Sequence, residues 1–85
     1  MDAMESRALE ILAEVCEDSR VLEDPSLDLY RENLLDSFAL VQLLEALEDE
    51  LGVEIWLTQV KREETATPGQ VAALVRRLAA EGREQ

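Results

Sequence analysis

A serine hydroxyl next to a carboxylate is the group in this chain that could carry chemistry. Ser37 follows Asp36 and precedes Phe38 within the run Leu-Leu-Asp-Ser-Phe-Ala-Leu-Val of residues 34–41. Such a serine either caps the helix that begins here or presents its hydroxyl for covalent modification. The chain has no histidine and its one lysine is Lys61, so no side chain is available as the base that a catalytic serine needs. We therefore expect no catalytic residue in this chain.

The remaining composition argues against a metal site and against a membrane protein. Histidine, the commonest metal ligand, is absent, and the acidic residues between positions 18 and 33 lack the spacing of a calcium-binding loop. Cys16 is the only cysteine, so it forms no internal disulfide, and we expect it to be a small core residue. No apolar run approaches the roughly 20 residues that span a bilayer, and no signal peptide opens the chain. These features predict a cytoplasmic protein that does not insert into membranes.

The chain is strongly acidic, with a net charge of −12 from 20 acidic and 8 basic residues. This balance argues against nucleic acids and anionic membrane surfaces as partners, because both require clusters of lysine and arginine. Between Arg31 and Lys61 every charged side chain is acidic. That stretch is either a solvated helix face or a docking surface for basic partners. Its members are Glu32, Asp36, Glu45, Glu48, Asp49, Glu50 and Glu54.

The apolar periodicity predicts one all-α domain over residues 1–85, a small bundle of three main helices and one short helix. Gly52 supplies the residue that ends the second main helix, and Thr67-Pro68 is a start signal for the last one. The segment 53–57 alternates like a strand but has no partner strand, so we expect an extended connector there. The expected elements are a helix at about 4–17, a loop at 18–36, and helices at about 37–51, 58–62 and 68–80.

The second main helix has two faces when its residues are projected at about 100° per residue. Five leucines form the core stripe, whereas Phe38 and Val41 fall on the opposite side with Glu45 and Glu48. We expect these four residues to form a small apolar anchor within an acidic rim. The leucines of the core stripe are Leu40, Leu43, Leu44, Leu47 and Leu51.

Asp36 and Ser37 compete to cap this helix, because either side chain can accept a hydrogen bond from a backbone N–H of the first turn. If Asp36 is the cap, Ser37 takes the first helical position and its hydroxyl is free to face solvent. A helix N-terminus also tolerates a phosphodiester well, since unpaired N–H groups and partial positive charge meet there. Ser37 is therefore compatible with covalent attachment of a phosphorylated group.

The residues around Ser37 resemble a known family. Asp36-Ser37-Phe38, followed by Val41, Leu44 and Leu47-Glu48, is similar to the Asp-Ser-Leu/Met/Phe motif of the phosphopantetheine-dependent carrier proteins. The resemblance covers nearly the whole chain, and within the family it points to the D-alanyl carrier proteins of teichoic acid D-alanylation. The stretches that carry it are Asp28-Leu29-Tyr30, Leu34-Leu35-Asp36-Ser37-Phe38, Val41-Gln42-Leu43-Leu44, Glu48-Asp49, Arg62-Glu63-Glu64 and Ala66-Thr67-Pro68.

The resemblance implies an acyl-carrier-protein-like fold and a mechanism in which the chain itself catalyses nothing. A phosphopantetheinyl transferase would attach 4′-phosphopantetheine to Ser37, and a D-alanine-activating ligase would load D-alanine on it as a thioester. A membrane-bound acyltransferase would then pass the D-alanyl residue towards lipoteichoic acid in the cell wall. Phe38, Val41, Glu45 and Glu48 would form the docking face of a monomeric carrier.

Three positions depart from the family pattern. Asn33 stands where glycine is usual, Trp56 where proline is common, and Thr65 where tryptophan is common. Asparagine also tolerates the left-handed conformation, so the turn at position 33 can be kept. Two alternatives to a D-alanyl carrier stay open: a free-standing aminoacyl or acyl carrier of a natural-product or fatty-acid pathway, and an acidic helical adaptor that has no cofactor.

Overall fold

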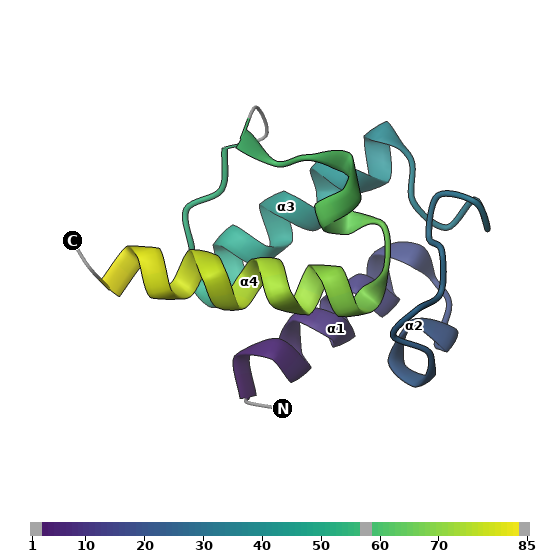
Figure 1. Ribbon diagram of the computed structural model, residues 1–85, viewed down its shortest axis with the longest axis horizontal. Helices are drawn as coiled ribbons and strands as arrows, with labels where there is room; N and C mark the ends of the chain where they lie inside the picture. Colours follow the sequence, from purple (N-terminus) through teal and green to yellow (C-terminus); the bar gives the residue numbers. More distant parts are fainter. Residues whose placement is uncertain (1–2, 57–58, 84–85) are drawn as a thin grey trace.

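The computed structural model describes residues 3–56 and 59–83, with side chains up to position 80. Over these residues it contains helices and no strand, which confirms the prediction of a small all-α bundle (Figure 1). None of the helices in these ranges is long and apolar enough to cross a membrane. The elements are α1 (Ala3–Cys16), α2 (Arg20–Glu23), α3 (Ser37–Leu51), η2 (Arg62–Thr65) and α4 (Pro68–Arg83).

The core lies where α1 packs against both α3 and α4 (Figure 1). Each of these helices is amphipathic and packs its apolar face into the core. Burial of each large aliphatic side chain stabilises the fold by about 1.5–3 kcal/mol. On α3 the leucine stripe is inside, with Leu40 and Leu51 partly buried at its two ends. The fully buried large aliphatic residues of the three helices are Ile11, Leu12, Leu43, Leu47, Val71 and Val75.

The segment expected as a loop over 18–36 contains a short helix, α2, which the sequence reasoning did not predict. The Asp18 carboxylate accepts a hydrogen bond from the Arg20 backbone N–H at 2.9 Å and from its guanidinium at 2.8 Å. Asp18 precedes α2, so these bonds hold the first turn of α2 through a residue that is not part of the helix. Val21, Leu29 and Leu35 are buried, so their side chains attach the rest of the segment to the core.

Two backbone hydrogen bonds also join the loop segment to the residues after η2 and to the first turn of α4. The Leu29 N–H donates to the Ala66 carbonyl at 2.8 Å, and the Gly69 N–H donates to the Pro25 carbonyl at 3.0 Å. A Cβ atom at Gly69 would itself lie 3.0 Å from the Pro25 carbonyl oxygen. Glycine therefore permits the close approach that brings the start of α4 against the loop.

Within the range expected as a short helix, about 58–62, Gln59 has 3₁₀ geometry, and a separate short helix, η2, follows at Arg62–Thr65. The Glu64 carboxylate accepts a hydrogen bond from the Lys61 N–H at 2.9 Å, and the Glu64 N–H donates to the Lys61 carbonyl at 3.0 Å. This pair of bonds favours a helix that begins after Lys61, whereas Thr58, the first residue of the expected range, lies outside the described residues. Thr65, at the end of η2, is fully buried.

The main helices end and begin at the signals that the sequence carries. Gly52 closes α3 in the left-handed conformation, with φ of 68°, and its N–H donates to the Glu48 carbonyl at 3.0 Å. The Thr67 hydroxyl oxygen accepts a hydrogen bond from the Gln70 N–H at 3.1 Å and so caps α4, which starts at Pro68. Helix α4 runs on to Arg83, beyond the expected end near residue 80.

We predict that Cys16 reacts with iodoacetamide at pH 8 more than about tenfold more slowly in the native protein than in urea. Burial, and to a lesser extent the negative charge of Asp18, raises the pKa of its thiol to about 11, so little thiolate exists at pH 8. Intact mass read over time gives both rates. Equal rates in the native and unfolded protein would contradict the placement of Cys16 against the core.

Candidate functional site at the start of α3

The competition between Asp36 and Ser37 for the cap of α3 is decided in favour of Asp36. The Asp36 Oδ1 atom accepts a hydrogen bond from the Ala39 N–H at 2.8 Å, and the Asp36 carbonyl accepts from the Leu40 N–H at 2.8 Å. Ser37 is therefore the first residue of α3, and it is exposed. Because the carboxylate fulfils the capping role, the Ser37 hydroxyl is not needed for it.

The turn before Asp36 has a defined conformation. The Leu29 carbonyl accepts hydrogen bonds from the Leu34 N–H at 2.8 Å and the Leu35 N–H at 3.2 Å. Asn33 has φ of 59°, in the left-handed region, a conformation that asparagine tolerates, as expected. Leu35 is buried, so the chain enters α3 from an anchored position two residues before Ser37.

The four residues expected at the docking face share one exposed stripe of α3. Positions 38, 41, 45 and 48 are spaced three or four residues apart, which places them one above the other on a helix. The Phe38 residue is 72% exposed and Val41 is 39% exposed, and both glutamates are exposed. The structure thus places Phe38 and Val41 at the surface beside Glu45 and Glu48, as expected. Their contact with a partner stays a prediction.

The arrangement at Ser37 fits a group attached through a phosphate. The hydroxyl is exposed at the first position of a helix, where N–H groups of the first turn lack helical partners and favour negative charge. The neighbouring carboxylate is occupied by the Ala39 N–H. Among the described residues no group of histidine, cysteine and acidic side chains could hold a metal ion. The geometry is therefore compatible with a group attached through the Ser37 hydroxyl.

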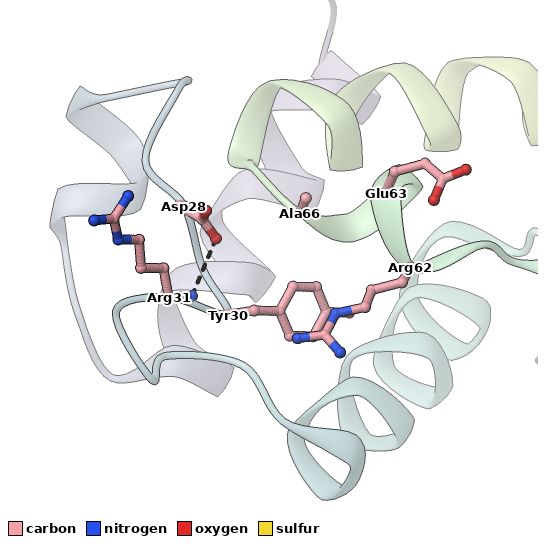
Figure 2. A pocket seen from close by; sticks show the side chains of 6 residues that line it. All are labelled: Asp28, Tyr30, Arg31, Arg62, Glu63 and Ala66. Carbon is pink, nitrogen blue, oxygen red and sulfur yellow. Dashed lines mark hydrogen bonds between the residues drawn. The ribbon is translucent and has the colours of Figure 1, made fainter.

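A pocket of about 420 Å³ lies between the 28–31 turn and η2 and was not predicted from the sequence. Two runs quoted for the family resemblance, Asp28-Leu29-Tyr30 and Arg62-Glu63-Glu64, meet there, but nothing in either run indicates that they touch (Figure 2). The Tyr30 hydroxyl lies 2.6 Å from Thr65 Oγ1, across 35 positions of sequence. The residues that line the pocket are Asp28, Tyr30, Arg31, Arg62, Glu63 and Ala66.

Comparison with known proteins gives a consistent result. Residues 6–75 match the family model described as "Phosphopantetheine attachment site". A D-alanyl carrier protein of Bacillus velezensis is 41% identical over 63 residues, which cover 74% of this chain and 81% of the relative. That of Bacillus pumilus is 44% identical over 62 residues, covering 73% and 80%. That of Bacillus cereus strain B4264 is 39% identical over 71 residues, covering 84% and 90%.

We predict that Asp36→Ala lowers the free energy of unfolding by about 1 kcal/mol, because the Ala39 N–H loses its capping acceptor. The matched control is Asp36→Asn, whose amide oxygen can accept the same hydrogen bond without the charge. Urea titration followed by circular dichroism measures both variants. A similar loss of unfolding free energy in Asp36→Ala and Asp36→Asn would show that the charge of Asp36, and not its capping hydrogen bond, stabilises α3.

We predict that Phe38→Ala changes the free energy of unfolding by less than about 0.5 kcal/mol, because this side chain is mostly exposed. Leu43→Ala on the same helix removes a fully buried side chain and should lower it by about 2–5 kcal/mol. Thermal and urea unfolding compare the two variants. A loss at Phe38 as large as the loss at Leu43 would place Phe38 in the core and remove it from the docking face.

Proposed function

The chain belongs to the phosphopantetheine-dependent carrier protein family, and we propose that it carries D-alanine as a thioester on a 4′-phosphopantetheine attached to Ser37. The observation that carries the proposal is the division of roles at the start of α3. Asp36 caps the helix, which leaves the Ser37 hydroxyl exposed for attachment. The identity to D-alanyl carrier proteins over most of the chain supports D-alanine as the cargo and D-alanylation of lipoteichoic acid as the purpose.

Attachment would join the Ser37 Oγ atom to the phosphate of the pantetheine arm in a phosphodiester. The arm comes from coenzyme A, and 3′,5′-adenosine diphosphate leaves. A phosphopantetheinyl transferase would provide the base, since the described residues around Ser37 offer none. Once attached, the arm supplies a thiol for the thioester. The role of this chain is then to present Ser37 on a fixed helix end, with the Asp36 cap holding that end.

The partners need only a weak and reusable contact with the carrier. Phe38 and Val41 would provide apolar contact, while Glu45 and Glu48 would steer a basic surface on the partner towards α3. We assign this face to the transferase, the D-alanine-activating ligase and the membrane-bound acyltransferase. Coenzyme A and ATP are cytoplasmic, so attachment and loading would occur in the cytoplasm.

We predict that purified protein incubated with coenzyme A and a promiscuous phosphopantetheinyl transferase gains the mass of one phosphopantetheine, and that Ser37→Ala gains none. Ser19→Ala is the matched control, because Ser19 is also exposed, also follows an aspartate and also precedes a helix, α2. It should be modified like the wild type. No gain in the wild type, or an equal gain in Ser37→Ala, would refute the carrier function and favour the adaptor alternative.

The cargo is tested next on the modified protein. A D-alanine-activating ligase with ATP should load it with D-alanine as a thioester that hydroxylamine releases, and Phe38→Ala should load more slowly while its fold is unchanged. Failure with this ligase, together with loading by an adenylating enzyme for another amino or acyl group, would replace D-alanine by that cargo. In that case the carrier function would stand and the pathway would be the alternative one.

A further inference from the structure

Within the part of the chain that the structure describes, two arginines lack an ion-pair partner although carboxylates are numerous. Among the arginines whose side chains are described, four form ion pairs, for example Arg20 with Asp18 at 2.8 Å and Arg76 with Glu5 at 3.4 Å. Within the described residues no carboxylate lies within ion-pair distance of Arg31 or Arg62, although acidic residues outnumber basic ones by 20 to 8. The four paired residues are Arg7, Arg20, Arg76 and Arg77.

Both unpaired arginines are exposed and line the pocket between the 28–31 turn and η2. Figure 2 shows Arg62 over the Tyr30 ring. Arg31 lies on the opposite side of Asp28 from Tyr30, and its side chain points away from the ring. The two guanidinium groups therefore do not converge on one point and do not form a clasp for a single small anion. They present two separate positive points along one edge, which we call the basic rim (Arg31 and Arg62).

The Arg62 side of the basic rim is held in place before any partner arrives. The guanidinium carbon of Arg62 lies 4.3 Å from the centre of the Tyr30 ring, in a cation–π contact. The Tyr30 hydroxyl lies 2.6 Å from Thr65 Oγ1, and Thr65 is fully buried. An ordered side chain loses less conformational entropy on binding than a free one, so Arg62 suits a specific contact.

The basic rim is joined to the segment that carries Ser37. Leu29 accepts hydrogen bonds from Leu34 and Leu35, just before the Asp36 cap, and its own N–H donates to Ala66 after η2. An enzyme that reacts at the Ser37 Oγ atom has to bring its active site to the first residue of α3. Such an enzyme therefore approaches the 28–31 turn and η2 more closely than an enzyme that acts only at the thiol end of the phosphopantetheine arm.

We propose that the basic rim docks onto acidic side chains of the phosphopantetheinyl transferase that modifies Ser37, an inference that rests on the proposed function. The exposed stripe of α3 is acidic and the basic rim is positive, so the carrier presents both signs of charge on segments that are joined to the start of α3. A partner with the complementary pattern is attracted in one orientation, and the opposite orientation places like charges together. The basic rim thus sets the direction from which the enzyme reaches Ser37.

The test is the rate of modification of Arg31→Gln, Arg62→Gln and the control Arg76→Gln by the transferase of the same organism. Each substitution makes the net charge more negative by the same amount. If only overall charge mattered, a partner attracted to the acidic stripe would show the same lowered KM for all three. We expect instead that KM for the carrier rises about two- to fivefold for Arg31→Gln and Arg62→Gln, with kcat unchanged, and does not rise for Arg76→Gln.

Charge reversal sharpens this test, because Arg62→Glu should raise KM further than Arg62→Gln, and more strongly at low salt. Circular dichroism checks that each variant is folded. Equal KM values for wild type, Arg31→Gln and Arg62→Gln would overturn the inference while leaving the proposed function intact, and a wild type that is not modified would refute the proposed function itself. Saturable shifts of the Arg31 and Arg62 amide signals on titration of the carrier alone with inorganic pyrophosphate would reassign the basic rim to phosphate ligands.

Discussion

The hydrogen bond from the Ala39 N–H to the Asp36 carboxylate is the interaction on which the candidate site depends. A helix has to satisfy the N–H groups of its first turn, and either of two adjacent polar residues could do so here. Because Asp36 does, α3 begins at Ser37, and the serine hydroxyl has no structural role to give up. Within α3, helical periodicity separates Leu43 and Leu47, which are buried, from Phe38 and Val41, which face solvent.

The cap can act in this way because the chain before it is immobilised by contacts with a distant segment. The long connection between α1 and α3 is bonded to the η2–α4 region through backbone groups at Leu29 and Gly69 and through the Tyr30–Thr65 hydroxyl pair. The small polar side chain of Thr65 is buried, with its hydroxyl paired to Tyr30 and to the Arg62 carbonyl. This pairing fixes Tyr30 beside the pocket.

The charge of −12 is distributed in a way that separates structural from surface roles. Several carboxylates tie elements together, as Glu50 does when it accepts a hydrogen bond from Arg7 Nε at 3.1 Å between α1 and α3. Each exposed ion pair of this kind contributes little to the free energy of folding, but it occupies the arginine that takes part in it. Glu45 and Glu48 are left at the surface of α3, and the basic rim is left at the pocket, so both signs of charge are available to partners.

The sequence by itself determined the features that arise from interactions between close neighbours in the chain. Helical periodicity separated the buried leucines of α3 from Phe38 and Val41, and the residue types at Asp36, Gly52 and Thr67 supplied caps that act within a few positions. The starts of α2 and η2 also rest on bonds between residues two or three positions apart, Asp18 with Arg20 and Lys61 with Glu64. Only the tertiary structure decided that Leu29 bonds to Ala66 and that Tyr30 meets Thr65 across 35 positions. Such contacts depend on how distant segments pack, and a linear pattern does not encode which surfaces meet. The pocket and the unpaired Arg31 and Arg62 followed from that packing alone.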